Sequence, residues 1–168
     1  MLRYMLLSDS HRAGGWLARA AEVYAQGGFN GVIHLGDVHS DAKRFAELAG
    51  VAPLCVRGNC EAEVDQMVLS FPVMADYAVI PMEGRVLYAT HGHHACEDAP
   101  PPLCPGDILL CGHTHIPRCA EHEGFVYMNP GSISLPKAGS ERSYMVYENG
   151  RFAWKRLEDG TVYQEYSI

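Results

Sequence analysis

Two patterns of apolar and polar positions alternate in the first third of the chain. Short, continuous apolar runs predict strands, and apolar residues at helical spacing between them predict helices. Strands that are apolar throughout are typical of parallel pairing in a sheet that is covered on both faces. The three strand candidates are residues 3–7, 31–35 and 53–56.

The two predicted helices have definable ends. The first spans residues 16–24 and stops at two consecutive glycines, which end helices readily. The second spans residues 40–48, with Ser40 or Asp41 as its N-cap. Short polar side chains are favoured there because they accept a hydrogen bond from a free backbone N–H group.

The rest of the chain is predicted to form strands separated by turns. Asn149-Gly150 predicts a type I′ hairpin, because both residues tolerate the positive φ angles of that turn. A stretch rich in proline and cysteine, residues 96–105, predicts a loop that could cover a site. The strand candidates are residues 73–80, 85–90, 107–111, 124–129, 144–148 and 151–157.

Composition narrows the class of protein. The 168 residues are 48% hydrophobic and 20% charged, which fits one globular domain over residues 1–168 and excludes a disordered chain. The formal net charge of −7 lacks the overall basic footprint of a non-specific nucleic-acid binder, so a nucleic acid partner is not expected, although a local basic patch and a nuclease stay open. No apolar run approaches the roughly 20 residues that span a bilayer, so we expect no membrane association.

The cysteines predict a reducing compartment. The 6 cysteines form no C-x-x-C pair, and the first residues do not resemble a signal peptide. We therefore expect free thiols and a cytoplasmic protein. They are Cys55, Cys60, Cys96, Cys104, Cys111 and Cys119.

Residues able to bind metals follow five of the strand candidates. In open α/β sheets, ligands collect outside the carboxyl ends of the strands, so we expect these side chains to converge. Glycine before Asp37, Asn59 and His113 allows the backbone to turn sharply. In chain order they are Asp9, His11, Asp37, Asn59, His91, His93, His113 and His115. The other histidines, His34, His39, His94 and His122, lack this placement and are interpreted as structural or exposed.

The kind of ligand indicates the kind of metal. Carboxylates, a carboxamide and imidazoles together suit Mn, Fe, Zn or Co better than Ca or Mg. The set exceeds the needs of one tetrahedral ion and suits two ions about 3.5–4 Å apart that share a carboxylate. Two divalent cations, two aspartates and one hydroxide leave a charge of about +1, which matches a phosphodiester anion, although a monoester stays open.

The order of these motifs resembles the calcineurin-like metallophosphoesterase superfamily. The resemblance covers residues 2 to about 147 and is carried by Asp9-x-His11, Gly36-Asp37, Gly58-Asn59, His91-Gly92-His93 and Gly112-His113-x-His115. Two further segments are similar to the small bacterial YfcE-type phosphodiesterases. They are Val56-Arg57-Gly58-Asn59-Cys60-Glu61 and Asn129-Pro130-Gly131-Ser132, the second read as a turn that could border the site.

The resemblance implies a fold and a ligand set. The fold is α/β, a four-layer αββα sandwich of two mixed β-sheets flanked by helices. Two divalent transition metal ions are expected, Mn first, with Zn, Fe, Co or Ni as alternatives. The implied ligands are Asp9, His11 and His115 for the first ion, Asn59, His91 and His113 for the second, and Asp37 as the bridge.

These features predict a phosphoric diester hydrolase. In this reading a metal-bridging hydroxide attacks a small phosphodiester in line. A phosphomonoesterase or cyclic-nucleotide phosphodiesterase on the same site stays open, as does a non-catalytic scaffold similar to the retromer subunit of this fold. The sequence also leaves a homo-oligomer open.

The chain departs from the superfamily pattern at two positions. Cys60 stands where many members have a histidine that is thought to protonate the leaving oxygen, so we assign the catalytic proton transfer to His93. Arg12 stands where glycine is more usual, and either a solvated side chain or a phosphate clamp fits it.

Overall fold

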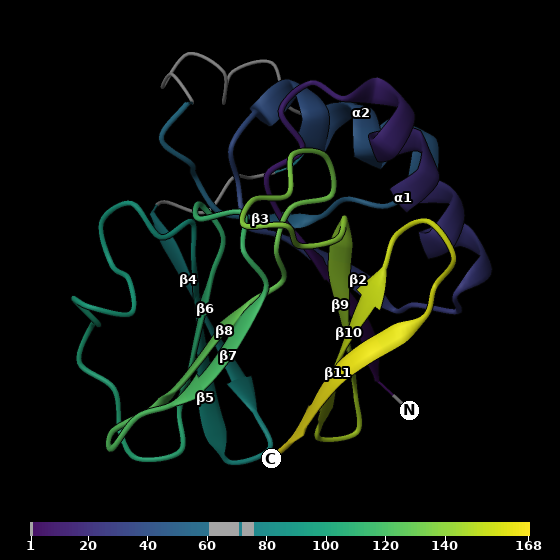
Figure 1. Ribbon diagram of the computed structural model, residues 1–168. Coiled ribbons are helices and arrows are strands. Elements are labelled where there is room, and N and C mark those ends of the chain that lie inside the picture. The colour runs from purple at the N-terminus through teal and green to yellow at the C-terminus, as the bar shows by residue number, and fades with distance from the viewer. Residues whose placement is uncertain (1, 61–70, 72–75) are drawn as a thin grey trace.

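Two β-sheets pack face to face in the computed structural model, which describes residues 2–60, 71 and 76–168 (Figure 1). The larger sheet has the strand order β11-β10-β9-β1-β2-β3, and the smaller has the order β4-β5-β6-β8-β7. Each sheet contains both parallel and antiparallel pairs. This arrangement confirms the predicted α/β sandwich of two mixed sheets.

The six-stranded sheet combines the beginning and the end of the chain. Its parallel part is β1 (Arg3–Leu7), β2 (Gly31–His34) and β3 (Leu54–Cys55), as the apolar runs predicted. Its antiparallel part is β9 (Ser143–Glu148), β10 (Arg151–Arg156) and β11 (Val162–Ser167).

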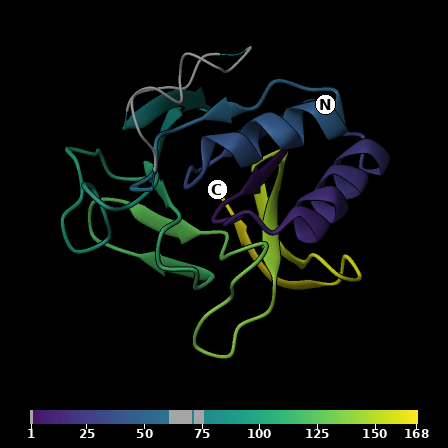
Figure 2. The same ribbon diagram turned by 90° about the horizontal axis from the view of Figure 1, so that it is seen from above.

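Both described helices lie against the outer face of this sheet (Figure 2). They are α1 (Gly14–Gln26) and α2 (His39–Ala49). Strand β1 shows why its sequence is apolar throughout: Leu6 faces the other sheet, whereas Met5 and Leu7 face the helices. The predicted cap of the second helix is wrong, because the N-cap is Val38 and no side chain caps it.

The five-stranded sheet packs against the first and contributes about half of the buried residues of the shared core. Its parallel centre is flanked by two antiparallel edge strands. Leu103 of the predicted loop packs on its outer face, beside Leu109 and Tyr127. The strands are β4 (Tyr77–Met82), β5 (Arg85–Thr90), β6 (Ile108–Cys111), β7 (Arg118–Glu121) and β8 (Val126–Asn129).

Most strand predictions are confirmed, and the exceptions are edge strands. The pairing of β9 with β10 confirms the hairpin, with φ angles of 49° at Asn149 and 74° at Gly150. Strands β7 and β11 were not predicted, because they are largely exposed and lack an apolar run. Residues 73–75 of the predicted strand 73–80 lie outside the described residues. Within the described part of the chain, no helix has the length and apolar character needed to cross a membrane.

Candidate metal centre

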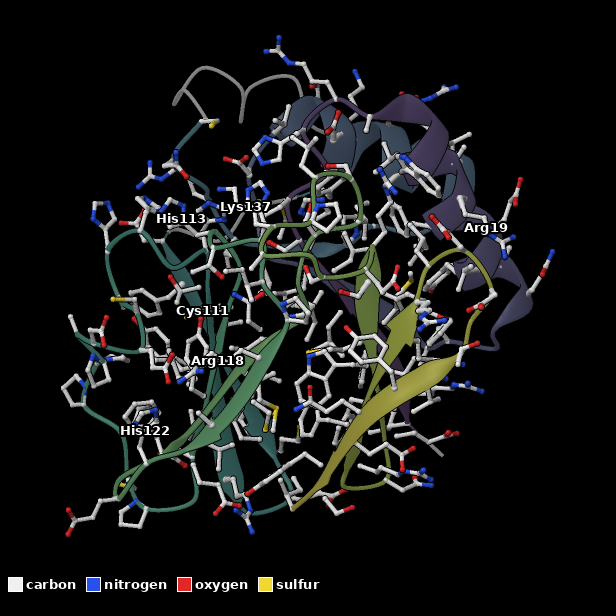
Figure 3. All side chains as sticks on the ribbon, viewed as in Figure 1. Arg19, Cys111, His113, Arg118, His122 and Lys137 are labelled. Carbon is white, nitrogen blue, oxygen red and sulfur yellow. The ribbon has the colours of Figure 1, made fainter. Side chains whose placement is uncertain are left out.

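The predicted ligands follow strands whose carboxyl ends lie at one edge of the sandwich, the upper edge in Figure 1. They follow the carboxyl ends of β1, β2 and β3 in the six-stranded sheet and of β5 and β6 in the five-stranded sheet. His113 is labelled at this edge in Figure 3. The convergence expected from the sequence is therefore present, and the side chains form two groups.

The first group contains Asp9, His11 and His115, whose donor atoms lie within 4.8 Å of one another. The two Nε2 atoms of His11 and His115 are 2.9 Å apart, and Asp9 Oδ1 lies 3.4 Å from His115 Nε2. The Nδ1 atom of His115 lies 2.8 Å from the Leu135 carbonyl oxygen. A proton on Nδ1 donated to that carbonyl leaves the Nε2 lone pair directed at the group.

The second group contains Asn59, His91 and His113. Asn59 Oδ1 lies 2.8 Å from His91 Nε2 and 3.1 Å from His113 Nδ1. His91 Nδ1 lies 2.7 Å from the Leu35 carbonyl oxygen, which requires the proton on Nδ1. Burial lowers the pKa of His91 to about 4, so the ring is neutral at pH 7. Its Nε2 lone pair therefore faces the amide oxygen of Asn59.

Asp37 lies between the two groups and contacts both. Its Oδ2 atom is 2.9 Å from His11 Nε2, and its Oδ1 atom is 3.8 Å from His91 Nε2. The residue is only 1% exposed, and Oδ1 accepts no hydrogen bond from the described residues. One carboxylate thus presents a different oxygen to each group.

The surroundings of the two aspartates fit a bound cation. Burial and the nearby charge of Asp37 raise the pKa of Asp9 to about 7, against the hydrogen bond that Asp9 accepts from the His113 backbone. Asp9 Oδ1 is also buried with no hydrogen-bond donor in the described part of the chain. Buried anionic and lone-pair atoms that face one another are costly unless a positive charge lies between them. The donor set therefore fits divalent metal ions.

The loop after β1 is held in a strained conformation by Asp41. Asp9, His11 and Arg12 have φ angles of 56°, 44° and 59°, in the left-handed region. The Asp41 carboxylate accepts hydrogen bonds of 2.6 Å from both Ser10 Oγ and the Arg12 backbone N–H group. Asp41 therefore fixes the loop that presents Asp9 and His11, a positioning role that the sequence analysis had missed by interpreting it as a helix cap.

Two glycines allow the loops to approach closely. A Cβ atom on Gly36, whose φ is 85°, would lie 2.7 Å from the Gly58 backbone nitrogen. A Cβ atom on Gly112 would overlap Ser8 Oγ and lie 2.9 Å from Ser8 Cβ. Both distances are too short for a side chain, so the sequence requires glycine at these positions before Asp37 and His113.

The Asn-Pro-Gly-Ser segment borders the centre. Asn129 Nδ2 donates to the Gly112 carbonyl at 2.7 Å, and Ser132 Oγ donates to the Asp9 carbonyl at 2.7 Å. The backbone N–H of His113 donates to Asp9 Oδ2 at 3.0 Å. These bonds connect the loops of the two sheets, so the turn supports the centre as well as ending β8.

His93, Cys60 and Arg12 lie at the rim. The His93 ring centroid is 5.4 Å from that of His91 and 6.4 Å from that of His113. Burial and the neighbouring His94 lower the pKa of His93. A cavity of about 220 Å³ beside the centre is lined by His11, Arg12, Val38 and Cys60. A cavity of about 480 Å³ lies along β9, β10 and β11 and is lined by charges of both signs but by none of the predicted ligands.

Comparison with known proteins places the chain in a family. Residues 2–150 match the calcineurin-like phosphoesterase superfamily domain. The chain is similar to phosphodiesterase YfcE of Escherichia coli, with 34% identity over an alignment that covers 100% of this chain and 99% of the relative. It is 27% identical to a probable metallophosphoesterase of Mycoplasma pneumoniae, over 97% of this chain and 98% of that protein.

Two solved structures have the same fold as this chain. The structure of YfcE, a phosphoesterase from E. coli, superposes with a TM-score of 0.91 at 32% identity, over 99% of this chain and 100% of that one. Vps29 of Entamoeba histolytica complexed with Zn²⁺ shares the fold, with a TM-score of 0.70 at 18% identity over 99% of both chains. The sequence resemblance is thus confirmed, and this chain belongs to the calcineurin-like phosphoesterase superfamily.

Proposed function

We propose that this chain is a phosphodiesterase that uses two divalent transition metal ions, Mn²⁺ first, to hydrolyse small phosphodiesters. One observation carries the two-ion proposal: Asp37 contacts His11 through Oδ2 at 2.9 Å and His91 through Oδ1 at 3.8 Å. A carboxylate placed between two donor groups can serve two ions at once. The relative named as a phosphodiesterase supports diesters as the substrate class.

Each ion would be bound by residues from both sheets. When bound, the two ions supply water activation and neutralisation of the phosphoryl charge. The carbonyl groups of Leu35 and Leu135 fix the imidazoles of His91 and His115, so that their Nε2 lone pairs face the centre. The proposed ligands are Asp9, His11 and His115 for one ion, Asn59, His91 and His113 for the other, and Asp37 for both.

The residues at the rim suit a diester with an organic substituent. Arg12 offers a positive charge to the phosphate at the mouth of the 220 Å³ cavity, and Val38 and Cys60 offer it a less polar wall for the substituent. We assign proton transfer to the leaving oxygen to His93, whose ring stands beside both His91 and His113.

Metal analysis of three variants tests this proposal. Wild type should hold two ions per chain and hydrolyse an aryl phosphodiester faster than the matching monoester. Asp37→Ala should lose both ions and the activity, whereas Asn59→Ala should lose mainly one ion. Asp98→Ala, which removes an exposed carboxylate of the 96–105 loop, is the matched control and should keep both ions. Wild-type metal content in Asp37→Ala would contradict the shared-carboxylate arrangement.

A further inference from the structure

A second cluster of metal-binding side chains lies next to the centre but shares none of its proposed ligands. Asp76, His93 and His94 each offer one donor atom, and these atoms lie within 4.8 Å of one another. The sequence analysis interpreted His94 as structural or exposed and placed Asp76 inside a strand. The cluster was therefore missed, because it depends on the pairing of two strands.

Strand pairing brings Asp76 to the two histidines. Asp76 immediately precedes β4, which runs antiparallel to β5, and Tyr77 pairs with Thr90. The Thr90 hydroxyl donates to the Asp76 carbonyl oxygen at 2.8 Å. The start of β4 is thereby fixed beside the loop that leaves β5 and carries His93 and His94.

The Asp76 carboxylate is ionised and has one oxygen outside its ion pair. Arg57 Nε and Nη2 both donate to Oδ1, at 3.0 and 2.8 Å. This hydrogen bonding lowers the pKa of Asp76, so the group is anionic at neutral pH. The charge of Arg57 is compensated within the ion pair, and Oδ2 takes no part in these two bonds.

His93 and His94 lie close together, and one nitrogen of His93 has no hydrogen-bond partner among the described residues. Their ring centroids are 4.0 Å apart, and His93 Nδ1 is buried with no hydrogen-bond partner among the residues that the structure describes. A buried nitrogen without a partner is costly, and a cation would satisfy it. One carboxylate and two imidazoles, with a position left for water, form a common ligand set for Zn²⁺.

We propose that Asp76, His93 and His94 form a third, peripheral site for a divalent transition metal ion such as Zn²⁺, and that an ion bound there inhibits hydrolysis. His94 is exposed and the Asp76 side chain is 39% exposed, so an ion can enter from solvent. A His93 nitrogen that ligates the ion no longer has its lone pair available to carry a proton. Binding stands independently of the activity, whereas inhibition rests on the proposed function.

Zinc stoichiometry tests the binding. Protein loaded at its central sites is dialysed against increasing free Zn²⁺, and the bound metal is measured by plasma mass spectrometry. His94→Ala and Asp76→Asn should weaken the third ion's affinity by more than about tenfold. The asparagine keeps an oxygen for Arg57, which separates loss of a ligand from loss of the loop contact. His122→Ala is the matched control, because His122 is an exposed histidine at the opposite end of the five-stranded sheet from His113 (Figure 3).

A third ion in wild type and in His122→Ala, but not in His94→Ala or Asp76→Asn, supports the site. Absence of a third ion in wild type, or its retention in both cluster variants, overturns it. Circular dichroism of each variant verifies that it is folded, so a lost ion cannot be attributed to unfolding.

Inhibition is tested by titrating Zn²⁺ into Mn²⁺-loaded enzyme that hydrolyses an aryl phosphodiester. The rate of each protein is expressed relative to its own rate without zinc, and inhibition of His94→Ala should need more than about tenfold higher zinc. Equal inhibition of both proteins would mean that zinc acts by exchange at the central ions, and would overturn the inhibitory role. If neither protein hydrolyses diesters, the proposed function fails, while the stoichiometry still decides whether the third site exists.

Discussion

The two sheets contribute different chemistry to the same centre. The ends of the parallel strands in the six-stranded sheet supply the carboxylates, the carboxamide and one imidazole, whereas the ends of β5 and β6 in the five-stranded sheet supply only imidazoles. The six-stranded sheet provides Asp9, His11, Asp37 and Asn59, and the five-stranded sheet provides His91, His113 and His115.

This division puts the negative charge on one sheet. Asp9 and Asp37 are 0% and 1% exposed, and burial raises the pKa of Asp9, whereas burial lowers the pKa of His91. Both shifts favour the neutral form of each group, and a divalent cation reverses that preference for Asp9. Each donor group also mixes the sheets, since Asp9 lies beside His115 and Asn59 beside His91. Neither sheet alone can provide a complete site.

The largest expected effect follows from removing one imidazole of the five-stranded sheet at a time. His115→Ala should lose the ion next to Asp9, and His113→Ala the ion next to Asn59. Each variant should fall by more than about 10³-fold in diesterase activity, because several kcal/mol of charge stabilisation are lost. Metal analysis and the paramagnetic resonance of bound Mn²⁺ measure the outcome, with His122→Ala as control. Loss of the same ion in both variants would contradict the division into two groups.

The next effect isolates the six-stranded sheet in the metal-free protein. Burial raises the pKa of Asp9 from 3.8 to about 7, so between these values the folded state binds a proton that the unfolded chain has released. Stability contributed by this group therefore falls as pH rises from about 4 to 7, by about 4 kcal/mol.

Asp9→Asn removes that dependence. The free energies of unfolding of Asp9→Asn and of wild type are measured by urea denaturation in the presence of a chelator. The value for Asp9→Asn minus the value for wild type should increase by about 4 kcal/mol as the pH rises from about 4 to 7. The lowered pKa of His91 has the opposite sign, but both proteins contain His91, so its contribution cancels. Asp98→Asn should show no such trend. A difference that does not vary with pH would show that the carboxylate is not destabilised by burial.

The smallest of the three effects concerns proton transfer. His93→Ala should slow hydrolysis by roughly 10²-fold, the usual contribution of general acid–base catalysis, while Cys60→Ala should keep most of its rate. Both variants are measured on diesters with a good and a poor leaving group. If Cys60→Ala is the slower one, and its deficit grows as the leaving group worsens, the proton comes from Cys60 and the six-stranded sheet supplies it.

Local pattern was enough to predict the central strands and the motifs that carry the proposed ligands. The apolar run 3–7 coincides with β1, and 85–90 coincides with β5, because buried strands must be apolar on both faces. The motifs were recognisable because they follow these strands directly. Edge strand β11 carries no such run, since much of it faces solvent.

Residues whose roles depend on distant contacts could not be predicted. Asp41 has the local pattern of a helix cap, but its carboxylate binds Ser10 and the Arg12 backbone, about thirty positions earlier in the chain. Asp76 reads as part of a strand until β4 is paired with β5. In both cases the sequence shows the chemical group, and only the tertiary fold shows what it faces.

The hydrogen bond from Ser132 to the Asp9 carbonyl has a consequence for how the protein matures. It joins positions that are 123 residues apart, so this part of the centre closes only after the chain has been synthesised beyond residue 132 and docked. Contacts between such distant positions form late, because a long loop must be closed first. Metal uptake is then a final step of maturation, and the ions cannot guide early folding as they do in small zinc-dependent domains.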